Sequence, residues 1–255
     1  MPHTFEFSYH NPTQIHFGPN SFAKLADLIP REATVLLLYG GGSIKQNGIY
    51  DQVTQALGGH TVVEFGGVEP NPTLETLTAA VIRVKAQKIE FILGVGGGSV
   101  ADGAKFIACA ALYEGDGWDI VSGKYVPRQA LPVGIVLTLP ATGSESNAGA
   151  VVTRKATHEK RVFYVAPARP RFAILNPDVM ASLPDRQLEN GVVDAFVHVC
   201  EQYLTYPVGA LVQDGYAEAV MKALTMLAKT FDQRQTTSWR QNMMWAANQA
   251  LCGVI

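Results

Sequence analysis

The feature that most constrains the fold is a local order repeated through the first half of the chain: an apolar run, a glycine-rich turn and an amphipathic stretch. Apolar runs that predict strands lie at residues 34–39, 60–65, 91–95 and 133–137. Stretches with a helical pattern lie at residues 50–57, 73–87 and 101–113. Because strands that alternate with helices build βαβ units, we expect an α/β domain with a parallel sheet covered on both faces.

The pattern changes after Pro184, where long helical stretches replace the alternation. These stretches lie at residues 186–206, 210–230 and 239–251, with no strand-like run between them. We therefore divide the chain into an α/β domain at residues 1–183 and the start of an all-α domain at residues 184–255. The sequence stops at Ile255 without a polar tail, so we expect the helical domain to be incomplete.

The N-terminus predicts a small hairpin. Extended stretches at residues 5–9 and 14–17 flank a turn sequence at residues 11–13, and a helix is expected at residues 21–28. The region lacks a basic stretch followed by an apolar one, and no apolar run in the chain is long enough to cross a membrane. We expect a cytoplasmic protein.

Composition excludes several classes of protein. Of the 255 residues, 47% are hydrophobic and 16% are charged, and the charges are scattered singly, which indicates a compact globular chain. A net charge of −2 leaves no basic stripe for a nucleic acid, so the expected partner is a small molecule. The cysteines Cys109, Cys200 and Cys252 sit among apolar neighbours, which predicts buried, reduced thiols.

A Gly-Gly-Gly-Ser turn at residues 96–99 lies between an apolar strand and a helix that carries Asp102 in its first turn. Glycines let the backbone approach a pyrophosphate, and the amides and dipole of the following helix N-terminus attract it. Open α/β sheets bind ligands at this end of their strands, and Ser99 adds a hydroxyl donor. The alternative is a tight turn without a ligand. The pattern is not Gly-x-Gly-x-x-Gly, so an ordinary Rossmann fingerprint is not predicted.

A second Gly-Gly-Gly-Ser turn begins at Gly40, after the first strand of the repeat. A carboxylate here would bind the ribose diol of NAD and repel the 2′-phosphate of NADP. No Asp or Glu occurs between residues 35 and 50. The amide of Gly41, the hydroxyl of Ser43 and nearby Lys45 would instead tolerate or attract a phosphate. We therefore favour NADP(H) over NAD(H), and the alternative is a plain turn that binds nothing.

The stretch at residues 138–147 follows an apolar strand and is dense in small hydroxyl and amide side chains, among them Thr138, Thr142 and Asn147. Such side chains suit contacts with sugar hydroxyls and an amide. The alternative is an exposed turn whose hydroxyl groups cap a helix. Lys160 falls in a polar stretch typical of a solvated surface, and its neighbours indicate no role for it.

Asp194 and His198 are four residues apart on an expected helix, so both side chains project from one face within reach of a single ion. A carboxylate with an imidazole suits Fe²⁺ or Zn²⁺ better than Mg²⁺ or Ca²⁺. Apolar neighbours predict that the pair is buried, and a buried charge needs a partner or a metal. The alternative is an ordinary contact on a helix surface. The other histidines form no second pair, so further ligands lie beyond Ile255 or no metal binds.

Taken together, these motifs resemble those of the iron-containing (group III) alcohol dehydrogenases in order and spacing. The stretches that carry the resemblance are residues 68–73, 96–102, 139–145 and 191–198. Within the family, the branch of NADP-dependent aldehyde reductases and butanol dehydrogenases is the most similar, because its first turn also resembles Gly-Gly-Gly-Ser.

The resemblance implies an oxidoreductase that transfers hydride between NADP(H) and an alcohol or aldehyde, while a divalent metal, Fe²⁺ or Zn²⁺, polarises the substrate oxygen. Asp194 and His198 would be two of four metal ligands, and the other two would be histidines farther downstream. The resemblance also implies a homodimer that pairs its N-terminal strands.

For the cofactor, the resemblance assigns the pyrophosphate to Gly97, Gly98 and Ser99, with Asp102 close by. Residues that would line the nicotinamide-ribose region are Thr138, Thr142, Asn147 and Lys160. One alternative is a polyol dehydrogenase or a dehydroquinate-synthase-like enzyme, which would prefer NAD and zinc. Another is a truncated nucleotide-binding remnant without activity.

Overall fold

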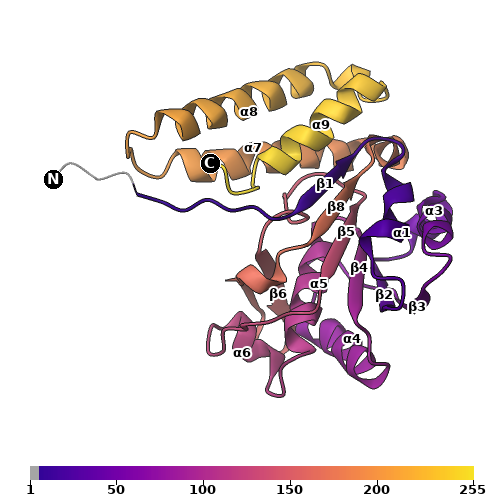
Figure 1. The fold of residues 1–255 in the computed structure, drawn as a ribbon. Coiled ribbons are helices and arrows are strands. Elements are labelled where there is room, and N and C mark those ends of the chain that lie inside the picture. The colour runs from indigo at the N-terminus through magenta and orange to yellow at the C-terminus, as the bar shows by residue number, and fades with distance from the viewer. Residues whose placement is uncertain (1–5) are drawn as a thin grey trace.

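The computed structural model describes residues 6–255, and its centre is a parallel sheet of six strands (Figure 1). The strand order across the sheet is β1-β8-β5-β4-β2-β3. The strands are β1 Gln14–Phe17, β2 Thr34–Tyr39, β3 Thr61–Phe65, β4 Phe91–Gly96, β5 Val133–Leu137 and β8 Phe172–Leu175. Every pair of neighbours runs parallel, which confirms the expected α/β fold.

Helices cover both faces of this sheet. One face carries α4 Leu74–Ala86, α5 Gly98–Ala110 and α6 Gly117–Val121. The other carries a 3₁₀ turn at Ser21–Lys24, then α1 Leu25–Leu28, α2 Ser43–Gln46 and α3 Ile49–Ala56. The apolar cluster on this face also includes residues of α7 Asp185–Tyr203, α8 Leu211–Lys229 and α9 Thr237–Gln249. Alternate residues of β2 enter the two apolar layers, because successive side chains of a strand point to opposite faces.

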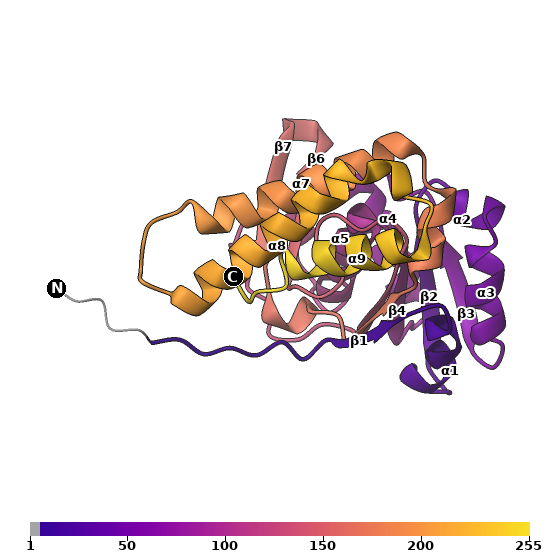
Figure 2. The same ribbon diagram turned by 90° about the horizontal axis from the view of Figure 1, so that it is seen from above.

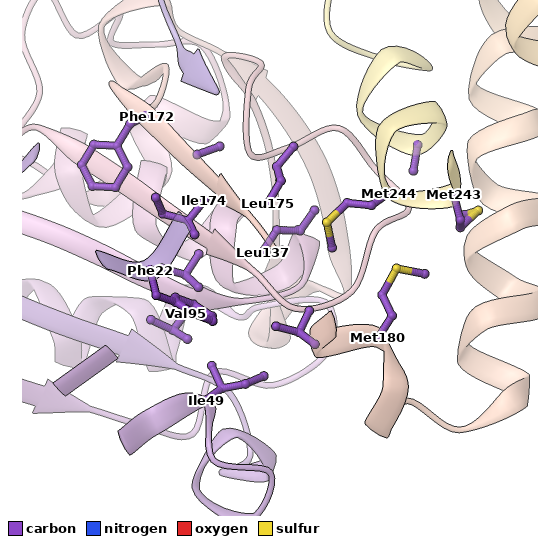
Figure 3. Packing of buried hydrophobic residues seen from close by; sticks show 14 of the residues in the cluster. Phe22, Ile49, Val95, Leu137, Phe172, Ile174, Leu175, Met180, Met243 and Met244 are labelled. Carbon is purple, nitrogen blue, oxygen red and sulfur yellow. The ribbon is translucent and has the colours of Figure 1, made fainter. Parts of the chain in front are cut away.

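One apolar cluster joins the sheet to the helical half of the chain (Figure 3). Met243 and Met244 of α9 belong to it, as do Leu137 and Leu175 at the ends of β5 and β8. α7, α8 and α9 pack together (Figure 2), and α7 faces the carboxyl ends of β2, β4 and β5. Pro184 directly precedes α7, close to the expected boundary. Both parts of the chain contribute residues to this core. The division into two domains stays a prediction.

The expected N-terminal hairpin is wrong within the described residues. Residues 1–5, which include the start of its first strand, lie outside the described part, and residues 6–13 form no strand. β1 pairs in parallel with β8, more than 150 positions later in the chain, from Gln14 with Phe172 onward. β1 therefore hydrogen-bonds to a strand distant in the sequence, where a hairpin with the preceding extended stretch was expected.

Three strands were not expected. β6 Gly149–Arg154 and β7 Glu159–Tyr164 form an antiparallel pair, and β8 extends the sheet beyond the run at residues 133–137. The polar residues at the start of β7 concealed its strand pattern in the sequence. Lys160, which is exposed, lies on this strand. α5 also begins at Gly98, earlier than expected. In the part of the chain that the structure describes, no helix is both long and apolar enough to span a bilayer.

Candidate active site

A cleft of about 890 Å³ opens at the carboxyl ends of β2, β4 and β5 and faces α7. Both Gly-Gly-Gly-Ser turns line it. The residues singled out from the sequence that line the cleft are Gly40, Gly41, Ser43, Gly97, Gly98, Ser99, Thr138, Thr142 and Asp194. Open α/β sheets bind ligands at this edge, so the cleft is the candidate functional site.

The turn after β4 has no room for side chains. A Cβ on Gly96 would lie 2.4 Å from Val100 Cγ2, and a Cβ on Gly98 would lie 2.7 Å from Thr142 Oγ1. Gly97 is extended, with φ −86° and ψ −164°, and α5 begins at the next residue. Gly97, Gly98 and Ser99 all line the cleft, so the N-terminal end of α5, where helix amides lack intrahelical partners, lies at the cavity wall, as pyrophosphate binding requires.

The turn after β2 is open. Gly42 has a φ of +95°, and Ser43 begins a helix of only four residues, α2. A Cβ on Gly41 or Gly42 would meet no atom within 4 Å. The turn is held from the β3 side, where Gly67 N donates to Gly40 O at 2.9 Å. This side of the cleft has space for a ligand group as large as a phosphate.

A carboxylate that the sequence search missed lies beside this turn. Three hydrogen bonds end on Glu64 of β3, from Tyr39 (3.0 Å), Tyr50 (2.5 Å) and Lys45 (2.9 Å). The Tyr50 bond is the main cause that lowers the pKa of Glu64, and the Glu64 bond raises the pKa of Lys45. Lys45 is thus already paired with an anion. Strand pairing brings Glu64 here, so a search between residues 35 and 50 could not find it.

Asp102 does not line the cleft. Its side chain is 15% exposed and accepts hydrogen bonds from Ser144 Oγ at 2.5 Å and Val151 N at 3.1 Å. Burial raises the pKa of this carboxyl, against the opposing effects of Lys105 and Ser144. Asp102 therefore fastens the segment at residues 138–151 to α5 from beneath the cleft.

Lys105, one turn after Asp102, is a buried cation that the sequence analysis did not single out. Its side chain is 0% exposed, and Nζ donates to Asn147 O at 3.3 Å, to Asn147 Oδ1 at 3.1 Å and to Gly149 O. Burial lowers the pKa of Lys105 to about 8. Asn147 thus contacts Lys105 and does not line the cleft. An Asp–Lys pair spaced by three in an otherwise apolar helix is the signal that could have found it.

The helical half holds the same segment from the other side. Asn248 of α9 donates to Glu145 Oε1 at 2.7 Å and to Ser146 Oγ at 2.9 Å. Asn147 Nδ2 donates to Leu251 O at 3.2 Å. Burial raises the pKa of Glu145, whose Oε2 has no hydrogen-bond partner among the described residues. The floor of the cleft is therefore fixed between α5 and α9.

Lys160 does not line the cleft either. Its Nζ donates to Asn71 Oδ1 at 2.7 Å, and the backbone N of Asn71 donates to Ser99 Oγ at 3.3 Å. Asn71 has a φ of +56°, a left-handed conformation that asparagine tolerates better than most residues. Lys160 is therefore linked to Ser99 of the glycine turn through one residue, Asn71.

Asp194 and His198 lie together on α7, with 3.5 Å between Asp194 Oδ2 and His198 Nε2. The expectation that they are buried is wrong: the side chains are 46% and 24% exposed. Their neighbours Val193 and Val197 line the same open cleft and are themselves exposed. The apolar neighbours thus divide between two surfaces: Val193 and Val197 face the cleft, while Val192 and Val199 belong to the core. The hydrogen bond with Asp194 is the main cause that raises the pKa of His198.

The pair fits part of a metal site. A carboxylate oxygen and an imidazole nitrogen share one helix face, and Asp194 lines the cleft, which suits Fe²⁺ or Zn²⁺. Across residues 6–255, no group of three or more His, Cys, Asp or Glu side chains could hold a metal ion. Asp194 and His198 would therefore supply two ligands and not a closed site.

α7 approaches the floor of the cleft very closely at Gly191. A Cβ there would lie 2.6 Å from the carbonyl oxygen of Pro140. Only a glycine lets the helix reach this distance without moving the backbone. Gly191 therefore sets the spacing between Asp194, one turn later, and the threonine-rich segment.

Known proteins match both the sequence and the fold. The family model for iron-containing alcohol dehydrogenase matches residues 12–177. The NADPH-dependent aldehyde reductase YqhD of Escherichia coli is 52% identical, covering 98% of this chain and 65% of that relative. Probable NADH-dependent butanol dehydrogenase 1 of Bacillus subtilis is 42% identical, with the same coverage of 98% and 65%.

Solved structures agree. The structure of E. coli YqhD gives a TM-score of 0.94 at 51% identity, over 97% of this chain and 65% of that one. NADH-dependent butanol dehydrogenase A from Thermotoga maritima gives 0.93 at 41% identity, over 98% and 64%. The chain spans about 65% of the length of the curated relatives it matches.

Proposed function

Because the chain belongs to the iron-containing alcohol dehydrogenase family, we propose that it binds a nicotinamide dinucleotide in this cleft and takes part in hydride transfer between an alcohol and an aldehyde. The observation that carries the proposal is the convergence of both glycine turns, Thr138, Thr142 and Asp194 on one cavity. Pyrophosphate, sugar and metal-ligating chemistry thus meet along a single path.

Each wall has its own task in this proposal. The amides at Gly97 and Gly98 bind the pyrophosphate, and the hydroxyls of Thr138 and Thr142 orient the ribose and the nicotinamide. Asp194 and His198 would hold a divalent metal on the opposite wall, which when bound supplies the charge that polarises the substrate oxygen. Val193, which lines the cleft beside Asp194, would help to exclude water from the reacting groups once a cofactor fills the cleft.

We propose NADP(H) as the preferred cofactor. The open turn at Gly41 and Gly42 contains no carboxylate, and an added Cβ at either glycine would meet no atom within 4 Å, so the turn leaves space for a 2′-phosphate. Glu64, the carboxylate beside this turn, is paired with Lys45 at 2.9 Å. Of the relatives, one is named NADPH-dependent and another NADH-dependent, so their names support either choice.

A titration tests the nucleotide proposal. The 255-residue chain should bind NADPH saturably, and more tightly than NADH, as followed by nicotinamide fluorescence. Thr142→Val should weaken binding, because Thr142 lines the cleft. Thr157→Val is the matched control, since the Thr157 hydroxyl bonds to Glu159 on an exposed turn and should leave affinity unchanged. Wild-type chain that binds neither nucleotide would refute the proposal.

The exposed Asp194–His198 pair favours a second candidate, a nucleotide-binding unit that lacks metal chemistry by itself. Metal analysis separates the two. We expect weak Fe²⁺ or Zn²⁺ binding by this chain, and stoichiometric metal with NADPH-linked aldehyde reduction by a chain extended to the full length of its relatives. An extended chain that holds metal but reduces no aldehyde would rule out the dehydrogenase. A homodimer in the cytoplasm stays a prediction, which sedimentation and cell fractionation can check.

A further inference from the structure

A fully buried ammonium group lies on α5, the helix whose first residues line the proposed nucleotide site. The side chain of Lys105 is 0% exposed, although lysine is almost never fully buried unless it is paired. Its Nζ meets two backbone carbonyls and one side-chain amide oxygen, all at Asn147 and Gly149. These residues continue the segment whose first part, from Thr138 to Thr142, lines the cleft. An ammonium group has three N–H donors, so these three acceptors use its full capacity.

Asp102 and Lys105 hold four points of that segment between them. Asp102 accepts from Ser144 Oγ and Val151 N, and Lys105 donates to Asn147 and Gly149. The two side chains stand one turn apart on α5, the helix that begins with the glycine turn. α5 therefore fixes both the pyrophosphate amides and the floor that faces them.

The held segment continues into the threonines of the cleft. Ser144 N donates to Thr142 Oγ1 at 3.3 Å, and Thr142 Oγ1 packs 2.7 Å from the place of a Cβ on Gly98. A shift of the segment would thus move Thr142 relative to the turn. Such shifts of a fraction of an ångström are large for a site that must fit a rigid cofactor.

We propose that Lys105 is a positioning residue: its ammonium group holds the segment at residues 138–151 on α5, so that the affinity for the nicotinamide dinucleotide depends on the charge of Lys105. The inference rests on the proposed function and deepens it. Lys105 contacts no ligand itself and acts on the nucleotide site only through its hydrogen bonds to Asn147 and Gly149.

The charge of Lys105 changes in an accessible range. Burial lowers its pKa to about 8, while Asp102 on its own helix and Glu145 in the segment raise it and Arg169 lowers it. Below this pKa the ammonium form satisfies all three acceptors. Above it the neutral amine has one donor fewer, so an acceptor loses its partner and the segment loosens. Nucleotide affinity should therefore fall as the pH rises through the pKa of Lys105.

The test is the dissociation constant of NADH, which carries no titrating 2′-phosphate, between about pH 7 and about pH 9.5. Wild type should lose about tenfold in affinity, the effect of one charged hydrogen bond. Lys105→Met should bind weakly at every pH and show no step. Cys109→Ala is the matched control: Cys109 is buried one turn later on α5 and bonds to no part of the segment, so the wild-type step should persist.

Glu145→Gln provides a test that does not depend on folding of the Lys105 variant. Glu145 raises the pKa of Lys105, so this variant should move the step to lower pH. A wild-type affinity that stays level over the range, or a step that survives in Lys105→Met, would overturn the proposal.

Failure of the proposed function gives a different result. If wild type binds no nucleotide at any pH, hydrogen-exchange protection of the amides in residues 142–151 still decides the role of Lys105. We expect protection to fall in wild type above about pH 8 and to be low throughout in Lys105→Met. Equal protection in both proteins would overturn the positioning role by itself.

Discussion

The same four letters, Gly-Gly-Gly-Ser, occur at two strand ends of one sheet and form two different structures. After β4 the turn is extended at Gly97 and opens a helix of 13 residues, α5, most of which is buried. After β2 the turn passes through a left-handed glycine, Gly42, and opens a helix of four residues. The first has side chains or backbone within contact distance of every glycine Cβ position, and the second has open space at two of three.

The difference lies in the neighbours and not in the tetrapeptide. β4 is central in the sheet, so its turn meets Val100 and Thr142 from flanking segments. β2 lies next to the edge strand β3, and its turn meets the solvated Glu64 pair. The sequence of such a turn therefore predicts that a ligand can bind there. The packing of neighbouring residues around the turn decides how rigidly the ligand is held.

The largest contrast should come from adding one methyl group to each turn. Gly96→Ala puts a Cβ 2.4 Å from Val100, and overpacking of this kind costs about 1–3 kcal/mol. Gly41→Ala meets no atom and should leave the urea midpoint unchanged, yet weaken nucleotide binding, because Gly41 lines the cleft. Equal unfolding midpoints for the two variants would show that the turns are alike.

Backbone conformation should give the next largest effect. Gly42 has a φ of +95°, so Gly42→Ala should cost about 1–2 kcal/mol through left-handed strain. Gly97 has a φ of −86°, which alanine adopts freely, so Gly97→Ala should cost less despite its tighter surroundings. Chemical denaturation of both variants checks the order, and the reverse order would mean that packing outweighs strain here.

The two serines should differ more modestly. Ser99 Oγ accepts from Asn71 N, so Ser99→Ala should lose about 1 kcal/mol, the net value of one hydrogen bond. The side chain of Ser43 makes no hydrogen bond within residues 6–255, and Ser43→Ala should stay within about 0.5 kcal/mol of wild type. Thermal melts measure both, and an effect of Ser43→Ala as large as that of Ser99→Ala would contradict the contrast.

The smallest effect should come from the exposed pair beside the first turn. Lys45 and Glu64 are 43% and 38% exposed, and water screens such a pair. Lys45→Met should therefore leave the unfolding midpoint nearly unchanged, and added salt should remove any remaining difference. A clear destabilisation that persists in high salt would mean that the first turn is as tightly built as the second.

Local pattern predicted the elements well wherever a strand or helix depends on its own residues. The run at residues 133–137 forms β5 with those bounds, and Thr73 caps α4 where a helix was expected to start. Errors appear where a distant partner decides. β1 pairs with β8 and not with its neighbour in sequence, and the polar start of β7 concealed a strand.

The site shows the same division. Nine of the residues singled out from sequence line the cleft. Chain order alone places eight of them after strand ends, and the ninth, Asp194, lies on α7. Asp102 and Asn147 were expected to face the cofactor, and the structure places them behind the floor with Lys105. Asp194 was expected to be buried and is half exposed, since it faces the open cleft together with Val193 and Val197.

The sequence by itself determined the α/β order, the two glycine turns at strand ends and the Asp–His spacing on one helix face, since each depends on residues close together in the chain. Only the tertiary structure decided that Glu64 lies beside the first turn, that Lys105 sits beneath the second, and that the two Gly-Gly-Gly-Ser segments differ. The bond from Lys105 to Gly149 spans 44 positions. Contacts of that range depend on which strands become neighbours, and strand order is a property of the whole chain.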